Sequence, residues 1–125
     1  MTYILTIPEK LNEVCDKYNT RISLMPPAIS IEARFNNKGA LSSGTIVLGA
    51  FTSLDLMISV TYHELGHLVL GHTNVHKVGY KEERQCWLWA LKQMYIDGYT
   101  IPYHIKRQCV RSLNTYKAKN DESNH

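Results

Sequence analysis

The amino-acid sequence predicts an α+β fold, in which a small β-sheet packs on a central helix with two or three further helices around it. The length of 125 residues allows one domain with a single modest core. Two short segments between residues 28 and 49 have strand-like patterns. The segment of residues 54–70 is apolar nearly all round when it is drawn as a helix, which is typical of a buried central helix.

One helix and two strands are expected before residue 50. Residues 8–19 are predicted to be helical, because Pro8 suits a first turn and apolar residues follow at helical spacing. Residues 28–35 alternate apolar and polar side chains, which predicts a strand, and the following letters NNKG predict a turn. Residues 45–49 are predicted to be a second short strand, which is bounded by the letters SSG and by Gly49.

The central helix is predicted to extend from residue 54 to residue 70. Thr52 or Ser53 can cap its N-terminus, because a hydroxyl side chain accepts a hydrogen bond from one of the free backbone N–H groups. Gly71 is its predicted end, because glycine suits the left-handed backbone conformation that follows many helices.

Two further helices and a polar tail are expected after this helix. Residues 81–97 are predicted to be helical and to end at Gly98, and another helix begins near Pro102. The polar residues 120–125 are predicted to be a disordered tail. The single domain is therefore expected to cover residues 1–119.

Composition and charge argue against several classes of protein. The net charge of +3 is too small to indicate nucleic-acid binding, and the basic residues of the last quarter are typical of a solvated helix face. The three cysteines are far apart and form no CxxC pair, which argues against a disulfide framework and favours a reducing compartment. The chain begins without the features of a signal peptide, and no apolar run is long enough to span a membrane. We therefore expect a cytoplasmic protein without a membrane partner.

Residues 61–72, TYHELGHLVLGH, place three histidines and one glutamate in an otherwise apolar segment. At about 100° per residue, His63, Glu64 and His67 share one face of the helix. The letters HELGH match H-E-x-x-H, in which two histidines one turn apart bind one zinc ion and the glutamate is the general base. The motif predicts one Zn²⁺ per chain, with His63 and His67 as ligands and Glu64 as the catalytic base. The alternative is a pair of core histidines that hydrogen-bond to backbone or water.

A zinc site of this kind needs a third protein ligand, and Glu83 is the best candidate. Its carboxylate falls in the middle of an apolar stripe on the predicted helix of residues 81–97, where a cation would offset the cost of burial. The competing interpretation is that Glu83 lies in the first turn, where acidic residues favour the helix dipole and still reach water. For Glu82, which faces another side, the dipole is the better explanation.

His72 and His76 are weaker candidates for the third ligand. On a continuous helix, His72 lies about 180° round from His63, so it faces away from the ion. It can reach the ion only if the chain bends sharply at Gly71. Both histidines are therefore expected to be ordinary loop residues rather than metal ligands.

These motifs resemble those of the ImmA/IrrE-type zinc metallopeptidases. That family has H-E-L-G-H on one helix and E-x-x-A-[ND]-x-F-A on the next, and the letters EERQCWLWA match the second pattern in part. The match carries the family's third ligand to Glu83, its small residue to Cys86, and its aromatic–alanine pair to Trp89 and Ala90. The resemblance covers roughly residues 28–102, and the first motif is far more specific than the second.

The sequence departs from this family pattern in two places. Trp87 replaces the usual Asn or Asp, so a hydrogen bond from that position to a zinc-binding histidine is missing. The Leu-Leu-Met-Pro that usually follows the aromatic–alanine pair is replaced by LKQMYIDGY. The edge of the cleft and the substrate preference are therefore expected to differ from those of the family.

The resemblance implies a zincin-like fold and a gluzincin-like site, in which a glutamate is the third zinc ligand. It implies a metalloendopeptidase that hydrolyses a peptide bond in an intracellular protein, such as a repressor or another regulator in a phage or mobile element. A donor that stabilises the oxyanion is also needed. The candidates for it are Tyr62, His72, His76 and Tyr80, and the sequence does not choose between them.

Two other functions stay open at the level of sequence. The first is a zinc-stabilised binding module that sequesters a transcriptional regulator without cutting it. The presence of Glu64 favours the enzyme over this module, because a structural zinc site needs no general base. The second is a nucleic-acid-associated zinc protein, which rests only on the basic residues of the last quarter.

Overall fold

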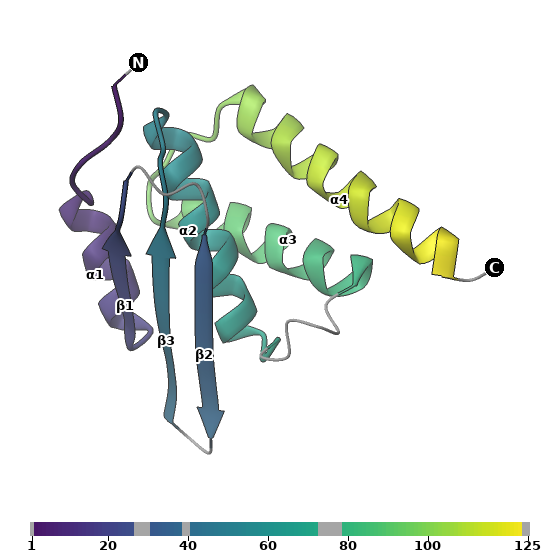
Figure 1. The fold of residues 1–125 in the computed structure, drawn as a ribbon, viewed down its shortest axis with the longest axis horizontal. Helices are drawn as coiled ribbons and strands as arrows, with labels where there is room; N and C mark the ends of the chain where they lie inside the picture. The colour runs from purple at the N-terminus through teal and green to yellow at the C-terminus, as the bar shows by residue number, and fades with distance from the viewer. Residues whose placement is uncertain (1, 27–30, 39–40, 73–78, 124–125) are drawn as a thin grey trace.

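The structure is a computed structural model that describes residues 2–26, 31–38, 41–72 and 79–123. The helices and strands of these residues form a small α+β fold, which confirms the fold class predicted from the sequence (Figure 1). In chain order, the elements are α1 (Glu9–Lys17), β1 (Thr20–Leu24), β2 (Glu32–Lys38), β3 (Leu41–Leu48), α2 (Leu54–Val69), α3 (Tyr80–Ile96) and α4 (Tyr103–Ser123).

The three strands form one mixed sheet in the order β1-β3-β2. The central strand β3 pairs in parallel with β1 and antiparallel with β2. Ile46 of β3 lies between Ile22 of β1 and Ala33 of β2 in the register. Ile46 is fully buried, so this position marks where the sheet meets the hydrophobic core.

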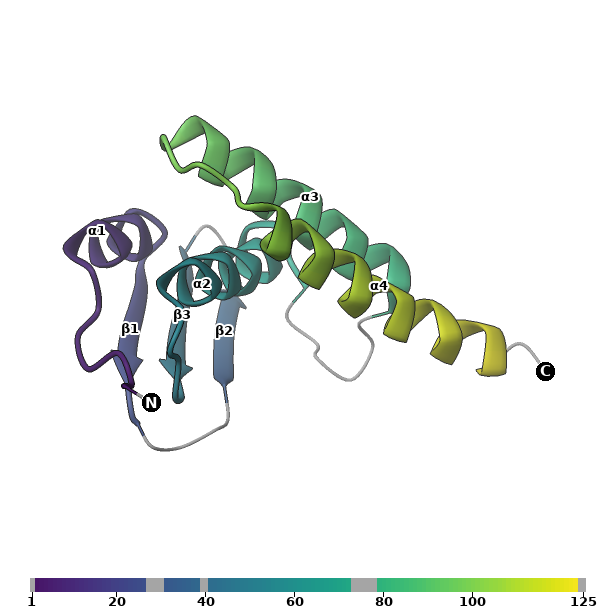
Figure 2. The same ribbon diagram turned by 90° about the horizontal axis from the view of Figure 1, so that it is seen from above.

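Helix α2 is enclosed by the other elements. Figure 2 shows α1 and α2 on one face of the sheet, with α3 and α4 packed beyond α2. Because α2 contacts β2 and β3 as well as α3 and α4, much of its circumference is buried, as its apolar pattern predicted. Within the described residues, no helix is long and apolar enough to cross a lipid bilayer.

Local signals at both ends of α2 were predicted correctly. The Ser53 hydroxyl accepts a hydrogen bond from the Leu56 N–H at 3.2 Å, so Ser53 rather than Thr52 is the N-cap. Gly71 has a φ of 78°, in the left-handed region that glycine adopts most easily. The chain turns there, and the His72 N–H donates to the His67 carbonyl at 2.7 Å.

Helices α2 and α3 approach each other closely at Gly66. A Cβ atom added to Gly66 would lie 3.2 Å from the Cys86 carbonyl oxygen and 3.3 Å from the Trp89 ring. These distances are tighter than ordinary van der Waals contact, so the missing side chain lets α3 pack against the H-E-x-x-H helix. This packing places the first turns of α3 beside the histidines of α2.

The sequence prediction missed one strand and misjudged a turn. Strand β1 was not predicted, although it pairs along its whole length with β3. The predicted turn NNKG was wrong for residues 36–38, because β2 continues to Lys38 and β3 begins at Leu41. The turn itself and residues 28–30, where the strand was predicted to begin, lie outside the described residues.

The terminal helices also differ from their predicted bounds. Helix α1 is shorter at both ends than the predicted segment of residues 8–19. Helix α4 begins directly after Pro102, as expected, and extends to Ser123. It therefore passes into residues 120–123, which were predicted to belong to a disordered tail.

Candidate metal centre

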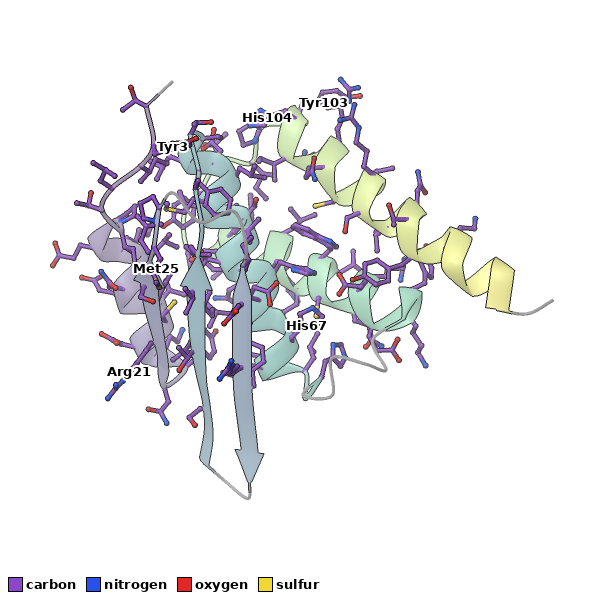
Figure 3. The ribbon with its side chains drawn as sticks, viewed as in Figure 1. Tyr3, Arg21, Met25, His67, Tyr103 and His104 are labelled. Carbon is purple, nitrogen blue, oxygen red and sulfur yellow. The ribbon has the colours of Figure 1, made fainter. Side chains whose placement is uncertain are left out.

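One carboxylate joins the two histidines of the H-E-x-x-H motif. Oε2 of Glu83 lies 2.6 Å from Nε2 of His63, and Oε1 of Glu83 lies 3.0 Å from Nε2 of His67. Glu83 is 2% exposed and His67 is 8% exposed. Figure 3 shows His67 on the C-terminal part of α2, on the side where α3 lies. The three side chains could together hold a metal ion.

The spacing of these donor atoms fits a small ion such as Zn²⁺. Tetrahedral zinc with bonds of about 2.0–2.1 Å to nitrogen and oxygen separates neighbouring ligand atoms by about 3.3 Å. The contacts of 2.6 and 3.0 Å from Glu83 to His63 and His67 are slightly shorter, as expected for direct hydrogen bonds. All three donor atoms lie within 4.8 Å of one another, so small side-chain movements would bring them to the ligand positions.

The carboxylates and histidines at this centre shift one another's pKa. Burial alone would raise the pKa of Glu83, but the hydrogen bonds and charges of His63 and His67 outweigh it and lower this pKa to about 2. Burial would lower the pKa of His63, but hydrogen bonds and charges from Glu64 and Glu83 raise it to about 9. Glu83 is therefore an anion that needs positive charge beside it.

Glu64 lies next to the three metal-binding candidates without joining them. Its Oε1 is 3.5 Å from Nδ1 of His63, and its side chain is 20% exposed. It lines a cavity of about 200 Å³, together with His63, His67 and Glu83. Glu64 therefore lies on the cavity beside the three side chains that could hold a metal, and it is not one of them.

The cavity is also lined by residues that the sequence prediction missed. Ile31, Ala33 and Phe35 come from the segment of β2, and Tyr116 comes from α4. Burial raises the pKa of Tyr116, as do the charges of nearby Glu83 and Glu64. No local pattern marks these residues, because β2 and α4 meet the H-E-x-x-H helix only through the tertiary fold.

Trp87 supports His63 by stacking rather than by a hydrogen bond. The two ring centroids are 4.3 Å apart, and the ring planes differ by 25°. The indole Nε1 of Trp87 has no hydrogen-bond partner among the described residues. The sequence predicted that the hydrogen bond usual at this position would be missing, and the contact observed in its place is aromatic.

A second cluster surrounds the other ring nitrogen of His67. The Cys86 Sγ lies 3.1 Å from Nδ1 of His67 and 3.3 Å from Nδ1 of His72. Cys86 is fully buried, and burial together with nearby carboxylates raises the pKa of its thiol. His67, His72 and Cys86 could also hold a metal ion.

The prediction that His72 faces away from the site was wrong. It assumed a continuous helix, but α2 ends at Val69 and the chain turns at Gly71. The centroid of the His72 ring lies 5.5 Å from that of the His67 ring, and His72 lines the cavity. Its Nδ1 lies against Cys86, whereas Glu83 contacts Nε2 of His67.

The adjacent residue Glu82 has a separate role. Its Oε2 accepts a hydrogen bond from the Gly79 N–H at 3.1 Å and so closes the N-terminus of α3. The sequence predicted this difference between Glu82 and Glu83, although it assigned Glu82 to the helix dipole rather than to a cap.

Two other oxyanion candidates, Tyr62 and Tyr80, do not line the cavity as His72 does. Tyr62 is fully buried, and its hydroxyl donates to Oδ2 of Asp97 at 2.6 Å, so the structure removes it from the candidates. Tyr80 begins α3 and does not line the cavity. His76 lies outside the described residues.

Comparisons with models of protein families, with characterised proteins and with solved structures give no match for this chain. The resemblance to the ImmA/IrrE-type metallopeptidases therefore rests on the two motifs alone.

Proposed function

We propose that this chain is a zinc-dependent endopeptidase. The observation that carries the proposal is the buried Glu83 carboxylate, which contacts Nε2 of both His63 and His67. A carboxylate and two imidazoles that converge on one point are a ligand set that zinc uses in peptidases. The H-E-x-x-H pattern adds the base, Glu64, at the edge of the same cavity.

Bound Zn²⁺ would polarise a substrate carbonyl and make a nearby water more acidic. Glu64 accepts a proton from the attacking water and later donates it to the leaving amine. Its partial exposure and its place on the cavity wall suit this role, because the carboxylate must reach both water and substrate. Trp87 limits the movement of the His63 ring by stacking on it.

The cavity suits an extended peptide as substrate. Strand β2 is an edge strand of the described sheet, because it pairs with β3 alone among the described strands. Ala33 and Phe35 of this strand line the cavity, beside the glutamates and histidines. A substrate in extended conformation can add to such an edge through backbone hydrogen bonds.

The class of substrate is proposed from the resemblance of residues 28–102. We propose an intracellular protein as the target, such as a repressor or another transcriptional regulator of a phage or mobile element. The chain would then act in the cytoplasm, with one Zn²⁺ bound and without a membrane or nucleic acid as partner.

The replacement Glu64→Gln tests the enzymatic part of this proposal. It keeps the size of the side chain but removes the base, so zinc binding should persist while peptide hydrolysis falls by about 10²- to 10⁴-fold. The targets are found by comparing new protein N-termini in cells that produce the wild type or this variant. Wild-type-specific cleavage, repeated with the purified target and zinc-loaded protein, is the expected result.

A different result would favour the alternative function. If Glu64→Gln binds the same partner and changes cells as strongly as the wild type, the protein acts by sequestration. It would then be a zinc-stabilised binding module that captures a transcriptional regulator.

A further inference from the structure

The thiol of Cys86 lies between two histidines from another part of the chain. His67 belongs to α2, His72 follows the turn at Gly71, and Cys86 belongs to α3. The sulfur is 3.1 Å from Nδ1 of His67 and 3.3 Å from Nδ1 of His72, within hydrogen-bond distance for sulfur. Cys86 is fully buried, so its sulfur is shielded from water. The two histidine nitrogens are its hydrogen-bond partners among the described residues.

The two nitrogens of His67 face different groups. Nε2 faces Glu83 on the side of the metal centre, and Nδ1 faces Cys86. A neutral imidazole has one N–H donor and one acceptor nitrogen. If Nε2 uses its lone pair to bind a metal, the hydrogen is on Nδ1 and is donated to the sulfur.

The single hydrogen of the thiol then determines which ring nitrogen of His72 carries a hydrogen. Because the sulfur accepts the hydrogen bond from His67, its own hydrogen is free to donate to Nδ1 of His72. His72 must then hold its hydrogen on Nε2, the ring nitrogen that Cys86 does not occupy. Since His72 lines the cavity, this leaves an N–H donor available to a substrate oxygen.

We propose that Cys86 is a positioning residue, whose thiol accepts the Nδ1–H of His67 and donates its own hydrogen to Nδ1 of His72. The proposal deepens the proposed function and rests on it, because it takes Nε2 of His67 as a metal ligand. Metal-binding histidines usually donate their second N–H to a carboxylate, a carbonyl or water. In this chain a thiol makes that contact, and it connects the metal ligand to a second histidine.

Three variants test this role by zinc affinity. Cys86→Ala removes the hydrogen-bond partner and should weaken zinc binding about 10- to 100-fold, the usual range for groups that hold a metal ligand in place. Cys86→Ser keeps a group that both accepts and donates, so its loss should stay below about tenfold. Cys109→Ala is the matched control, because it removes another buried thiol that has no histidine contact in the described structure, and it should bind zinc like the wild type.

The positions of the ring hydrogens supply a readout that does not depend on folding of the variants. Nitrogen NMR of the zinc-loaded wild type should show hydrogen on Nδ1 of His67 and on Nε2 of His72. With Co²⁺ in place of zinc, the protein should show no thiolate-to-cobalt charge-transfer band. Such a band would overturn the proposal, because it would make Cys86 a metal ligand.

The same measurements separate this proposal from the proposed function. A wild type that binds no zinc would refute both. A wild type that binds zinc, together with a Cys86→Ala variant that binds it equally well, would refute only the role of Cys86. Hydrogen on Nδ1 of His72 would also refute it.

Discussion

The cavity has two walls that are built in different ways. On one wall, α2 and α3 bring His63, His67 and Glu83 into contacts of 2.6 and 3.0 Å. The second wall is the part of the lining that comes from the segment of β2 and from α4, and it includes apolar side chains and Tyr116, which lies near Glu83. The first wall contains three side chains that could hold a metal, whereas the second has apolar side chains and a strand, β2, whose outer edge pairs with no other described strand. We therefore expect changes in the first wall to affect metal binding and changes in the second to affect substrate.

The largest effect on metal binding is expected for a change at Glu83. Glu83→Ala should weaken zinc binding by about two orders of magnitude or more, because loss of a ligand should at least match the loss of a group behind a ligand. Glu82→Ala is the internal control, since Glu82 caps α3 and does not contact the histidines. A competition titration against a zinc chelator compares the two. Equal loss in both variants would mean that the helix end, rather than the Glu83 carboxylate, supports the metal.

A smaller effect on zinc affinity is expected for a change at Gly66, where α2 packs against α3. Gly66→Ala adds a Cβ atom 3.2 Å from the Cys86 carbonyl oxygen, so the backbone of α3 must move by a few tenths of an ångström. We expect the free energy of unfolding to fall by about 1 kcal/mol and zinc to bind several-fold more weakly. Chemical denaturation and zinc titration check these values. Helix propensity alone predicts the opposite change in stability, so a more stable variant with unchanged zinc affinity would show that close packing at Gly66 is not required.

The smallest effect on metal binding is expected on the second wall. Tyr116→Phe removes one hydroxyl near Glu83, and a typical hydrogen bond contributes about 1 kcal/mol, or roughly fivefold in affinity. Zinc affinity should therefore change by no more than about fivefold, because the Glu83 contacts with both histidines stay in place. The same zinc titration measures the affinity of this variant. A loss that matches Glu83→Ala would contradict the division into two walls.

The two walls also differ in how far the sequence predicts them. His63, Glu64 and His67 are placed by the geometry of one helix, so their spacing alone brings them to one face. Glu83 required one further step, the recognition of a carboxylate within an apolar stripe. Tyr116 gave no such signal, because its position depends on how α4 crosses α2 and α3.

Two errors have simple physical causes. The prediction for His72 extended helical geometry past Gly71, where the left-handed backbone brings the ring back toward His67. Strand β1 was overlooked because it follows α1 after only two residues and precedes a proline pair. Its alternating burial is a strand signal, but its parallel partner β3 lies far along the chain.

Metal analysis of the purified protein tests the central claim most directly. If His63, His67 and Glu83 form a zinc site, the wild type should hold close to one equivalent of zinc, which a chelator removes. The double variant His63→Ala, His67→Ala should hold none while keeping its helical content. A wild type that binds no zinc, or a double variant that still binds one equivalent, would contradict the claim that these side chains form the metal centre.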